Sequence, residues 1–110
     1  MEFNKVKIVT FVPKPNAEDV RKALGDAGAG RIGEYSYCSF SVSGEGRFMP
    51  MNNSNPNIGK INKQEVVEED RIEVVCNRSD AKAIIAALKQ SHPYEEVGFD
   101  IYPIIEENDL

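Results

Sequence analysis

The sequence is poor in the residues that build metal, redox and nucleophilic sites. Its 110 residues include two cysteines, one histidine and no tryptophan. Cys38 and Cys76 are too few for a disulfide scaffold and lack the C-x-x-C spacing of zinc or redox sites, so both are expected to be reduced. No serine–histidine–acid spacing, P-loop or paired-carboxylate signature is present. The sequence therefore gives no positive evidence for catalysis.

Long apolar runs and an excess of basic residues are also missing. The apolar stretches are too short to cross a bilayer, and 18 acidic against 13 basic residues give a net charge of -5. The short apolar stretches argue against a membrane as partner, and the negative charge, which repels a phosphate backbone, argues against nucleic acid. The first five residues lack a basic segment followed by an apolar run, so no secretory signal is predicted and a cytoplasmic location is expected.

The composition predicts one folded domain over residues 1–110. A hydrophobic content of 41% with 28% charged residues is typical of globular proteins. A chain of this length can build one core but not a core plus a second lobe.

Four strands and two helices are predicted in the order β-α-β-β-α-β. Alternating apolar residues predict strands at 5–12, 34–43, 65–76 and 97–102. Between the first two strands, Asn16 and Asp19 predict a capped helix that ends at Gly28. After the third strand, Ser79 predicts the cap of a helix with an apolar stripe, and Pro93 ends it. This order is the ferredoxin-like α+β arrangement, with a four-stranded antiparallel sheet and both helices on one face.

Side-chain parity predicts which residues of the sheet face the helices. In the second strand it places Cys38, Phe40 and Val42 toward the helices. The opposite face receives Val9, Phe11, Tyr35, Tyr37, Val75, Tyr102 and Ile104. That set is too apolar and aromatic to leave in water on a monomer, so the face is expected to pack against other subunits. The alternative is a wet sheet surface with scattered exposed apolar residues.

Residues 28–33 spell G-x-G-x-x-G, the pattern of dinucleotide-binding turns. That pattern requires a strand before it and a helix after it, whereas here a helix precedes and a strand follows. The glycines are therefore interpreted as tight-turn positions. With Arg31 among them, their backbone N–H groups could also form an anion-binding nest.

A long loop at residues 45–64 is the second candidate for function. It holds five asparagines, two prolines and several apolar residues. Loops of this length are usually functional or disordered, and the apolar residues favour the functional reading. The C-terminal tail at 106–110 is expected to fray.

The segment at residues 91–96, Ser-His-Pro-Tyr-Glu-Glu, is the third candidate. Pro93 forces His92 out of helical geometry at the corner between a helix and a strand. His92, Glu95 and Glu96 could ligate a metal ion, together with the cysteines if these converged. The favoured interpretation is a structural corner in which the imidazole bonds backbone or a carboxylate. The acidic stretch at 65–73 is interpreted as a solvated face with Arg71 paired inside it.

Several motifs in the same order carry a family likeness. They resemble the PII/CutA-like domain found as an insert in YqfO/YbgI-type proteins and also as a small stand-alone protein. The matching segments are residues 27–35, 38–40, 44–50, 55–59, 67–69 with 71–73, and 92–96. The resemblance implies a ferredoxin-like fold that associates, often as a trimer, and makes the long loop the counterpart of the PII signalling loop. It implies no activity, because the dinuclear metal site of YqfO-type proteins belongs to the flanking domain and the PII nucleotide motifs are not seen.

Together these observations predict an oligomeric, non-enzymatic module, a trimer or else a dimer, that binds a small ligand or a protein partner between subunits. The predicted binding residues are Arg31, Tyr35, Arg47, Phe48, Pro50, Asn55, Pro56, Gly59, His92, Tyr94, Glu95 and Glu96. The alternative is a CutA-like protein that binds a divalent metal through His92, Glu95 and Glu96, and the third hypothesis is an unrecognised hydrolase. No cofactor is expected apart from that metal.

Overall fold

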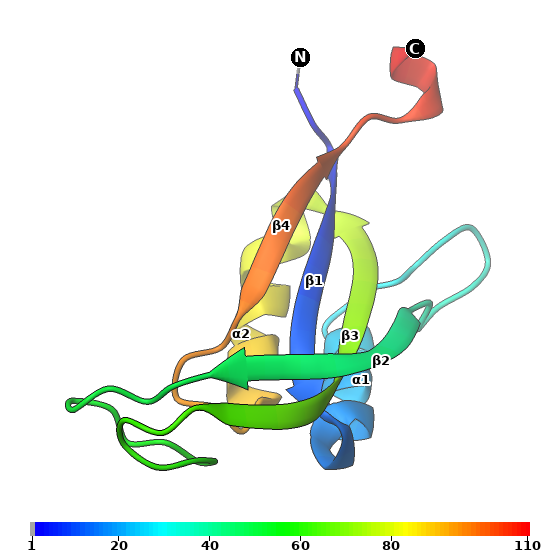
Figure 1. The fold of residues 1–110 in the computed structure, drawn as a ribbon. Helices are drawn as coiled ribbons and strands as arrows, with labels where there is room; N and C mark the ends of the chain where they lie inside the picture. Colours follow the sequence, from blue (N-terminus) through cyan, green and yellow to red (C-terminus); the bar gives the residue numbers. More distant parts are fainter. Residues whose placement is uncertain (1) are drawn as a thin grey trace.

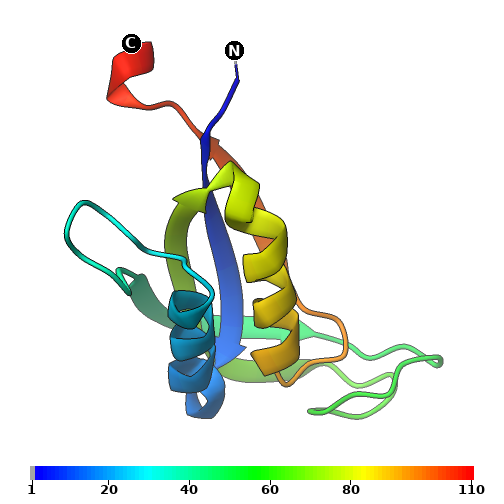
Figure 2. The same cartoon turned by 180° about the vertical axis from the view of Figure 1, so that it is seen from behind.

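Four strands form one antiparallel sheet, and two helices cover one of its faces (Figures 1 and 2). The computed structural model describes residues 2–110. The sheet order is β2-β3-β1-β4, which confirms the predicted ferredoxin-like architecture. The strands are β1 (Lys5–Pro13), β2 (Phe40–Phe48), β3 (Glu65–Asn77) and β4 (Phe99–Ile104), and the helices are α1 (Ala17–Asp26) and α2 (Ala81–Ser91).

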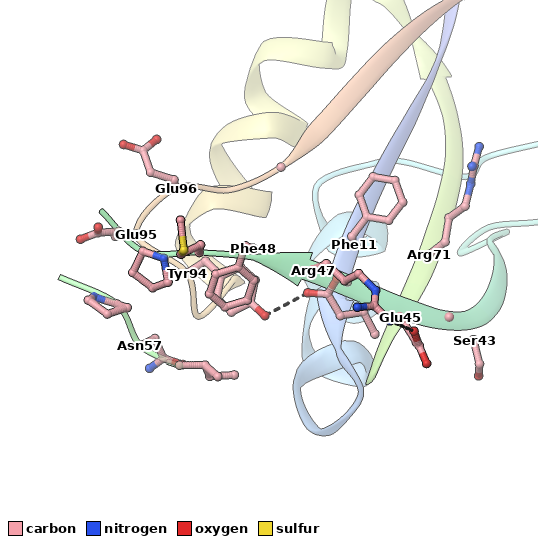
Figure 3. A pocket seen from close by; sticks show the side chains of 18 of the residues that line it. Phe11, Ser43, Glu45, Arg47, Phe48, Asn57, Arg71, Tyr94, Glu95 and Glu96 are labelled. Atoms are coloured by element: carbon pink, nitrogen blue, oxygen red, sulfur yellow. Dashed lines mark hydrogen bonds and ion pairs between the residues drawn. The ribbon is translucent and has the colours of Figure 1, made fainter. Parts of the chain in front are cut away.

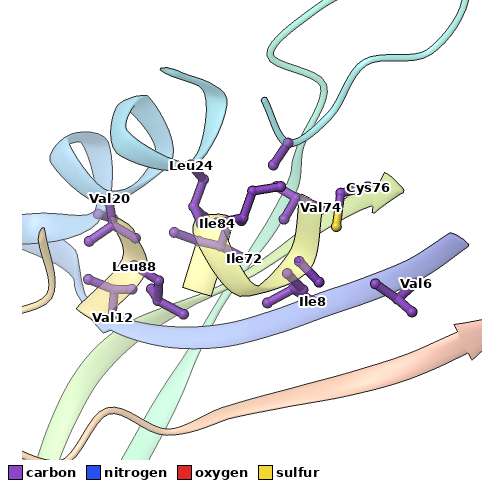
Figure 4. Packing of buried hydrophobic residues seen from close by; sticks show 13 residues of the cluster. Val6, Ile8, Val12, Val20, Leu24, Ile72, Val74, Cys76, Ile84 and Leu88 are labelled. Atoms are coloured by element: carbon purple, nitrogen blue, oxygen red, sulfur yellow. The ribbon is translucent and has the colours of Figure 1, made fainter. Parts of the chain in front are cut away.

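The core lies between the helices and the two central strands (Figure 4). Alternate residues of β1 and β3 point into it, and Ile8 pairs with Val74 in the antiparallel register. Each fully buried aliphatic side chain there contributes roughly 1.5 to 3 kcal/mol through burial. The labelled members are Val6, Ile8, Val12, Val20, Leu24, Ile72, Val74, Cys76, Ile84 and Leu88. The apolar stripe predicted for the second helix is therefore confirmed.

The helix ends differ slightly from the predicted caps. Asn16 occupies the N-cap position of α1, as predicted, but its side chain makes no cap hydrogen bond. Helix α2 begins after Asp80 and not after Ser79, because residues Arg78–Asp80 form a 3-10 turn. At the other end of α2, His92 is extended with φ -81° and ψ 138°. This geometry confirms the stop that Pro93 imposes.

Strand β2 begins later than predicted, and its side chains face the other way. Residues 34–39 form a connection and not a strand. Ser41 pairs with Ile72 of β3 and so faces the helices, where its hydroxyl accepts a hydrogen bond from Arg21 of α1. Phe40 and Val42 lie on the opposite face and are 67% and 50% exposed. The predicted parity was wrong, because a one-residue slip moves every side chain of a strand to the other face.

Two of the aromatic residues assigned to the open face of the sheet lie in the connection before β2. Tyr37 adopts a positive φ of 59°, and its ring fills the space beside Gly25 of α1. Its hydroxyl donates to Asp26, with 2.6 Å between the oxygens. The register confirms the open-face position of the other members, Val9, Phe11, Val75, Tyr102 and Ile104.

The two cysteines have different environments. Cys76 lies in the core, as predicted, and burial raises the pKa of its thiol. Cys38 is half-buried in the connection, where its backbone lies against Gly30. A β-carbon at Gly30 would collide with the Cys38 carbonyl, and the φ of Gly30 is +80°. The glycines of the G-x-G-x-x-G stretch therefore serve a turn, as interpreted from the sequence.

The long loop is shorter than predicted and covers residues 49–64. The four residues before it continue β2 and pair with β3, from Glu45 opposite Glu68 to Phe48 opposite Glu65. In the tail that is expected to fray, Glu107–Asp109 forms a short 3-10 helix. Among the residues that the structure describes, no helix has both the length and the apolar character needed to cross a membrane.

Candidate functional site

A pocket of about 700 Å³ lies on the sheet face opposite the helices, at the end that carries the long loop (Figure 3). Phe11 and Arg71 lie toward one end of it, and Tyr94, Glu95 and Glu96 toward the other. Strand β2 and the start of the loop form the wall between them. This volume is within the usual range of small-molecule sites.

Two glycines of β2 shape the wall of the pocket. Gly44 and Gly46 both line it, on the same side of the strand. A β-carbon at Gly44 would meet no atom within 4 Å, whereas one at Gly46 would collide with the carboxylate of Glu69. Glycine at 46 is therefore what allows this carboxylate to pack against β2.

A buried hydrogen bond joins β3 to the corner after α2. The Tyr94 hydroxyl donates to Oε2 of Glu69 over 2.9 Å, and Glu69 is only 7% exposed. The Tyr94 ring also packs edge-on against Phe48, with 5.7 Å between centroids. Burial, and then the bond to Glu69, raises the pKa of Tyr94 well above its usual value. Tyr94 therefore remains a neutral donor throughout the physiological pH range.

His92 holds this corner against β1. Its Nδ1 accepts the backbone N–H of Tyr94 over 3.1 Å, so Nε2 carries the proton and donates to the carbonyl of Phe11 over 2.7 Å. The residue is 6% exposed. Both ring nitrogens are thus used by backbone groups, which leaves no lone pair for a metal ion. This geometry agrees with the favoured interpretation of a structural corner.

The arginines of the pocket already have carboxylate partners. Arg47 pairs with Glu45 over 3.0 Å. The buried Nε of Arg71 lies 3.3 Å from Glu73, and the guanidinium lies 6.0 Å from the centre of the Phe11 ring. The sequence predicted that Arg71 is paired within the acidic stretch at 65–73, and the structure shows Glu73 as its partner.

Seven of the twelve predicted binding residues line this one pocket. They are Arg47, Phe48, Pro50, Pro56, Tyr94, Glu95 and Glu96. Two more, Asn55 and His92, are hydrogen-bonded to residues that line it. The backbone N–H of Asn55 donates to Glu95 over 2.9 Å, and His92 donates to the carbonyl of Phe11. Gly59, with φ +95°, lies in the same loop near Glu65.

Arg31 and Tyr35 are not part of this site. They lie in the connection between α1 and β2, which projects from the other side of the sheet (Figure 1). Arg31 lines a smaller pocket of about 170 Å³ with Lys5, Asn77 and Asp80. Ile32 and Tyr35 bond each other through their backbones.

The residues of the pocket that sequence reasoning missed include Phe11, Gly46, Glu69 and Arg71. The sequence predicts Glu69 on a solvated acidic face, but the residue is buried, with its carboxylate bonded to Tyr94 and packed against Gly46. The sequence did carry a signal, because Glu69, Arg71 and Glu73 are alternate residues of β3 and so point to the same face of the sheet. Antiparallel pairing with β1 places Phe11 on that face too, opposite Arg71.

The residues proposed for a metal site do not gather. Among residues 2–110, no group of three or more histidine, cysteine, aspartate and glutamate side chains is placed to hold a metal ion. Glu95 is bonded to the loop, and His92 faces the backbone of β1.

Comparison with known proteins finds relatives that are much longer than this chain. No family model matches. The GTP cyclohydrolase 1 type 2 homolog of Bacillus subtilis is 52% identical over 98 residues, which are 89% of this chain and 26% of that protein. The crystal structure of a Bacillus cereus protein related to NIF3 superposes with a TM-score of 0.82 at 46% identity, covering 94% of this chain and 26% of that one. The chain thus spans about a quarter of the length of these relatives.

More distant structures of similar size share the fold. CutA1 from a Shewanella species superposes with a TM-score of 0.71 at 22% identity, covering 96% of this chain and 86% of that one. GlnK from Bacillus subtilis superposes with a TM-score of 0.61 at 15% identity, covering 92% and 85%. The predicted PII/CutA-like architecture is confirmed.

Proposed function

We propose that this chain, a PII/CutA-like domain of the NIF3-related YqfO/YbgI family, is a non-catalytic module whose pocket binds a small ligand or a segment of a protein partner. The observation that carries this proposal is the convergence of three separate stretches of chain on one cavity. Strand β2, the loop at 49–64 and the corner at 92–98 each contribute to its wall.

The structure of the pocket favours ligand binding over catalysis. Its polar groups are tied to one another, as in the Tyr94–Glu69 bond and the Arg47–Glu45 pair. Phe11, Phe48 and Ile58 supply the apolar surface that small-ligand sites typically present. The pocket contains no serine or cysteine beside a histidine, since His92 donates to backbone. A nucleophile–base pair of the usual kind is therefore not assembled here.

We place this binding in a homo-oligomer, a trimer or else a dimer. Three apolar residues on the open face of the sheet, Phe40, Val42 and Tyr102, are 67%, 50% and 44% exposed. Val42 also lines the pocket, so a subunit packed on this face would border the bound ligand.

A ligand screen with a matched pair of variants tests the proposal. A compound or peptide that binds the folded protein raises its melting temperature by mass action. Phe48→Ala, which removes a wall of the pocket, is expected to abolish that shift. Tyr35→Ala removes an aromatic residue outside the pocket and is expected to preserve it. Hits that persist in Phe48→Ala and map by NMR to the connection at 27–39 would refute this location.

A further inference from the structure

We infer that the pocket selects a cationic ligand, an ammonium group carried on an apolar or aromatic body. This inference rests on the proposed binding function and adds the chemical class of the ligand. It depends on one buried carboxylate, on the pairing of the charges around it and on the aromatic walls.

Glu69 is a buried carboxylate that is only partly satisfied. It is 93% buried, and within residues 2–110 its one side-chain donor is the Tyr94 hydroxyl, which bonds Oε2. No lysine or arginine of that part of the chain lies within salt-bridge distance of it. A carboxylate offers about four acceptor sites, so Oε1 retains capacity for an N–H donor. A buried charge without a counter-charge is costly, and a cation in the pocket would compensate it.

The other charges of the pocket make its interior acidic. Two arginines, Arg47 and Arg71, line it: Arg47 pairs with Glu45, and Arg71 lies 3.3 Å from Glu73, which also pairs with Lys7. Glu69, Glu95 and Glu96 also line it, and none of these three has an ion pair among the described residues. An anionic ligand would therefore meet uncompensated negative charge, whereas a cation would be attracted.

Aromatic walls suit both parts of such a ligand. Phe48 and Tyr94 pack edge to face beside Glu69, and Phe11 lies at the other end of the pocket (Figure 3). Phe11 already has the Arg71 guanidinium over its ring, so Phe48 and Tyr94 are the aromatic walls left for the ammonium group. Gly44, which has no atom within 4 Å of the position of a β-carbon, leaves room between the walls for a flat apolar body.

Three probes of equal shape and different charge test the inference. Phenethylamine, 2-phenylethanol and 3-phenylpropionate carry the same ring on a short chain with a positive, neutral and negative end. In NMR titrations of the wild-type chain, the amine is expected to bind about tenfold more tightly than the alcohol, because hydrogen bonds to charged groups are the stronger ones. The acid is expected to bind most weakly. The largest shifts should fall on the backbone amides of Phe48, Glu69 and Tyr94.

A pair of adjacent glutamates supplies the matched variants. Glu69→Gln keeps the shape of the side chain and an acceptor for Tyr94 but removes the charge, so amine affinity should fall about tenfold, to the level of the alcohol. Glu68→Gln makes the same change in net charge at an exposed position outside the pocket. Its amine affinity should stay within about twofold of the wild type.

The outcomes separate this inference from the proposed function. If the alcohol or the acid binds the pocket as tightly as the amine or more tightly, the cation preference is wrong and the binding role of the pocket stands. If none of the three probes shifts the pocket amides, the cation preference is wrong, and the ligand screen with Phe48→Ala decides the binding role of the pocket. Should Glu69→Gln fail to fold, the order of the three probes in the wild-type chain still decides.

The cation could belong to a free amine or to a lysine of a protein segment. A capped phenylalanine–lysine dipeptide in the same titration distinguishes these sources. Tighter binding than phenethylamine supports a protein segment, and weaker binding supports a free amine. Binding of a capped phenylalanine–norleucine dipeptide as tight as that of the lysine form would overturn the cation preference.

Discussion

At the scale of single residues, His92 is the clearest case of a side chain that supports the site without facing a ligand. It joins the corner at Tyr94 to the carbonyl of Phe11 through two backbone hydrogen bonds. His92→Ala should lower the free energy of unfolding by about 1 to 3 kcal/mol, because it leaves buried backbone groups unpaired. Urea denaturation measures this. Zinc titration is the control, and submicromolar zinc binding that His92→Ala abolishes would contradict the structural role.

Tyr94 gives a prediction about pH. Its pKa in the folded state is raised, chiefly by burial, above the value of about 10 for an unfolded chain. The stability that it contributes is therefore complete below about pH 10 and is lost as the pH rises above that value, because the unfolded state releases the proton first. In urea denaturation from about pH 8 to about pH 11, Tyr94→Phe should flatten the alkaline fall in stability.

Tyr37 is the control for this experiment. The bond to Asp26 raises the pKa of Tyr37 too, but the residue is 56% exposed, so solvent screens the interaction. Tyr37→Phe should alter the alkaline slope less than Tyr94→Phe does. The same slope in wild type and Tyr94→Phe would show that the Tyr94 hydroxyl is not buried in solution.

Two glycines of β2 supply a matched pair for packing. Gly46→Ala should destabilise the fold by about 1 to 3 kcal/mol, because its methyl group collides with Glu69. Gly44→Ala meets open space and should be neutral or stabilising by up to about 1 kcal/mol, since glycine is unfavourable within a strand. Thermal denaturation of the two variants tests this. Equal stabilities would mean that Glu69 does not pack against β2.

At the scale of the elements, the amount of structure that could be predicted depends on how strongly each segment is buried. Strand β1, strand β3 and helix α2 carry periodic apolar residues that face the core, so their positions and faces were predicted correctly. Strand β2 is an edge strand rich in serine and glycine, with no core side chain to define its register. The alternation of Tyr35 and Tyr37 with serines predicted a strand from residue 34, whereas β2 begins at Phe40.

The candidate site was predictable where its residues had no core role. Arg47, Phe48 and Tyr94 stood out by residue type and by family likeness, and they line the pocket. Glu69 and Gly46 could not be recognised in the same way, because an acidic residue in a charged strand and a glycine in a flexible stretch both have simpler explanations. Only the pairing of β2 with β3 brings them together.

The loop at 49–64 gives a prediction about exchange. Few hydrogen bonds hold it, among them the Asn62 N–H to the Pro50 carbonyl and the Asn55 N–H to Glu95. Its amides should exchange with solvent faster than those of β1 and β3, and slow down when a pocket ligand is added. Hydrogen exchange with mass spectrometry measures both effects. Protection equal to that of the central strands without a ligand would make the loop a purely structural element.

At the scale of the whole molecule, one face of the sheet is covered by helices and the other carries exposed apolar side chains. The sequence suggested Tyr37 as a residue of this open face, but Tyr37 packs on α1. The residues that test assembly are instead Val42 and Tyr102, which the register of β2 and β4 places on the open face and which are 50% and 44% exposed. A face of this kind is common where subunits meet.

Assembly is therefore expected to depend on this face. Light scattering at micromolar concentration should return a trimer, or else a dimer, and Val42→Asp should dissociate it, because an unpaired carboxylate buried in an interface costs on the order of several kcal/mol. Tyr35→Asp is the control, since it adds the same charge at a position that is 76% exposed and lies off the sheet. A mass of 12.3 kDa for the native chain would contradict the oligomer. If Tyr35→Asp dissociated to a monomer and Val42→Asp did not, the interface would lie at the connection before β2 and not on the open face. In that case no subunit would border the pocket.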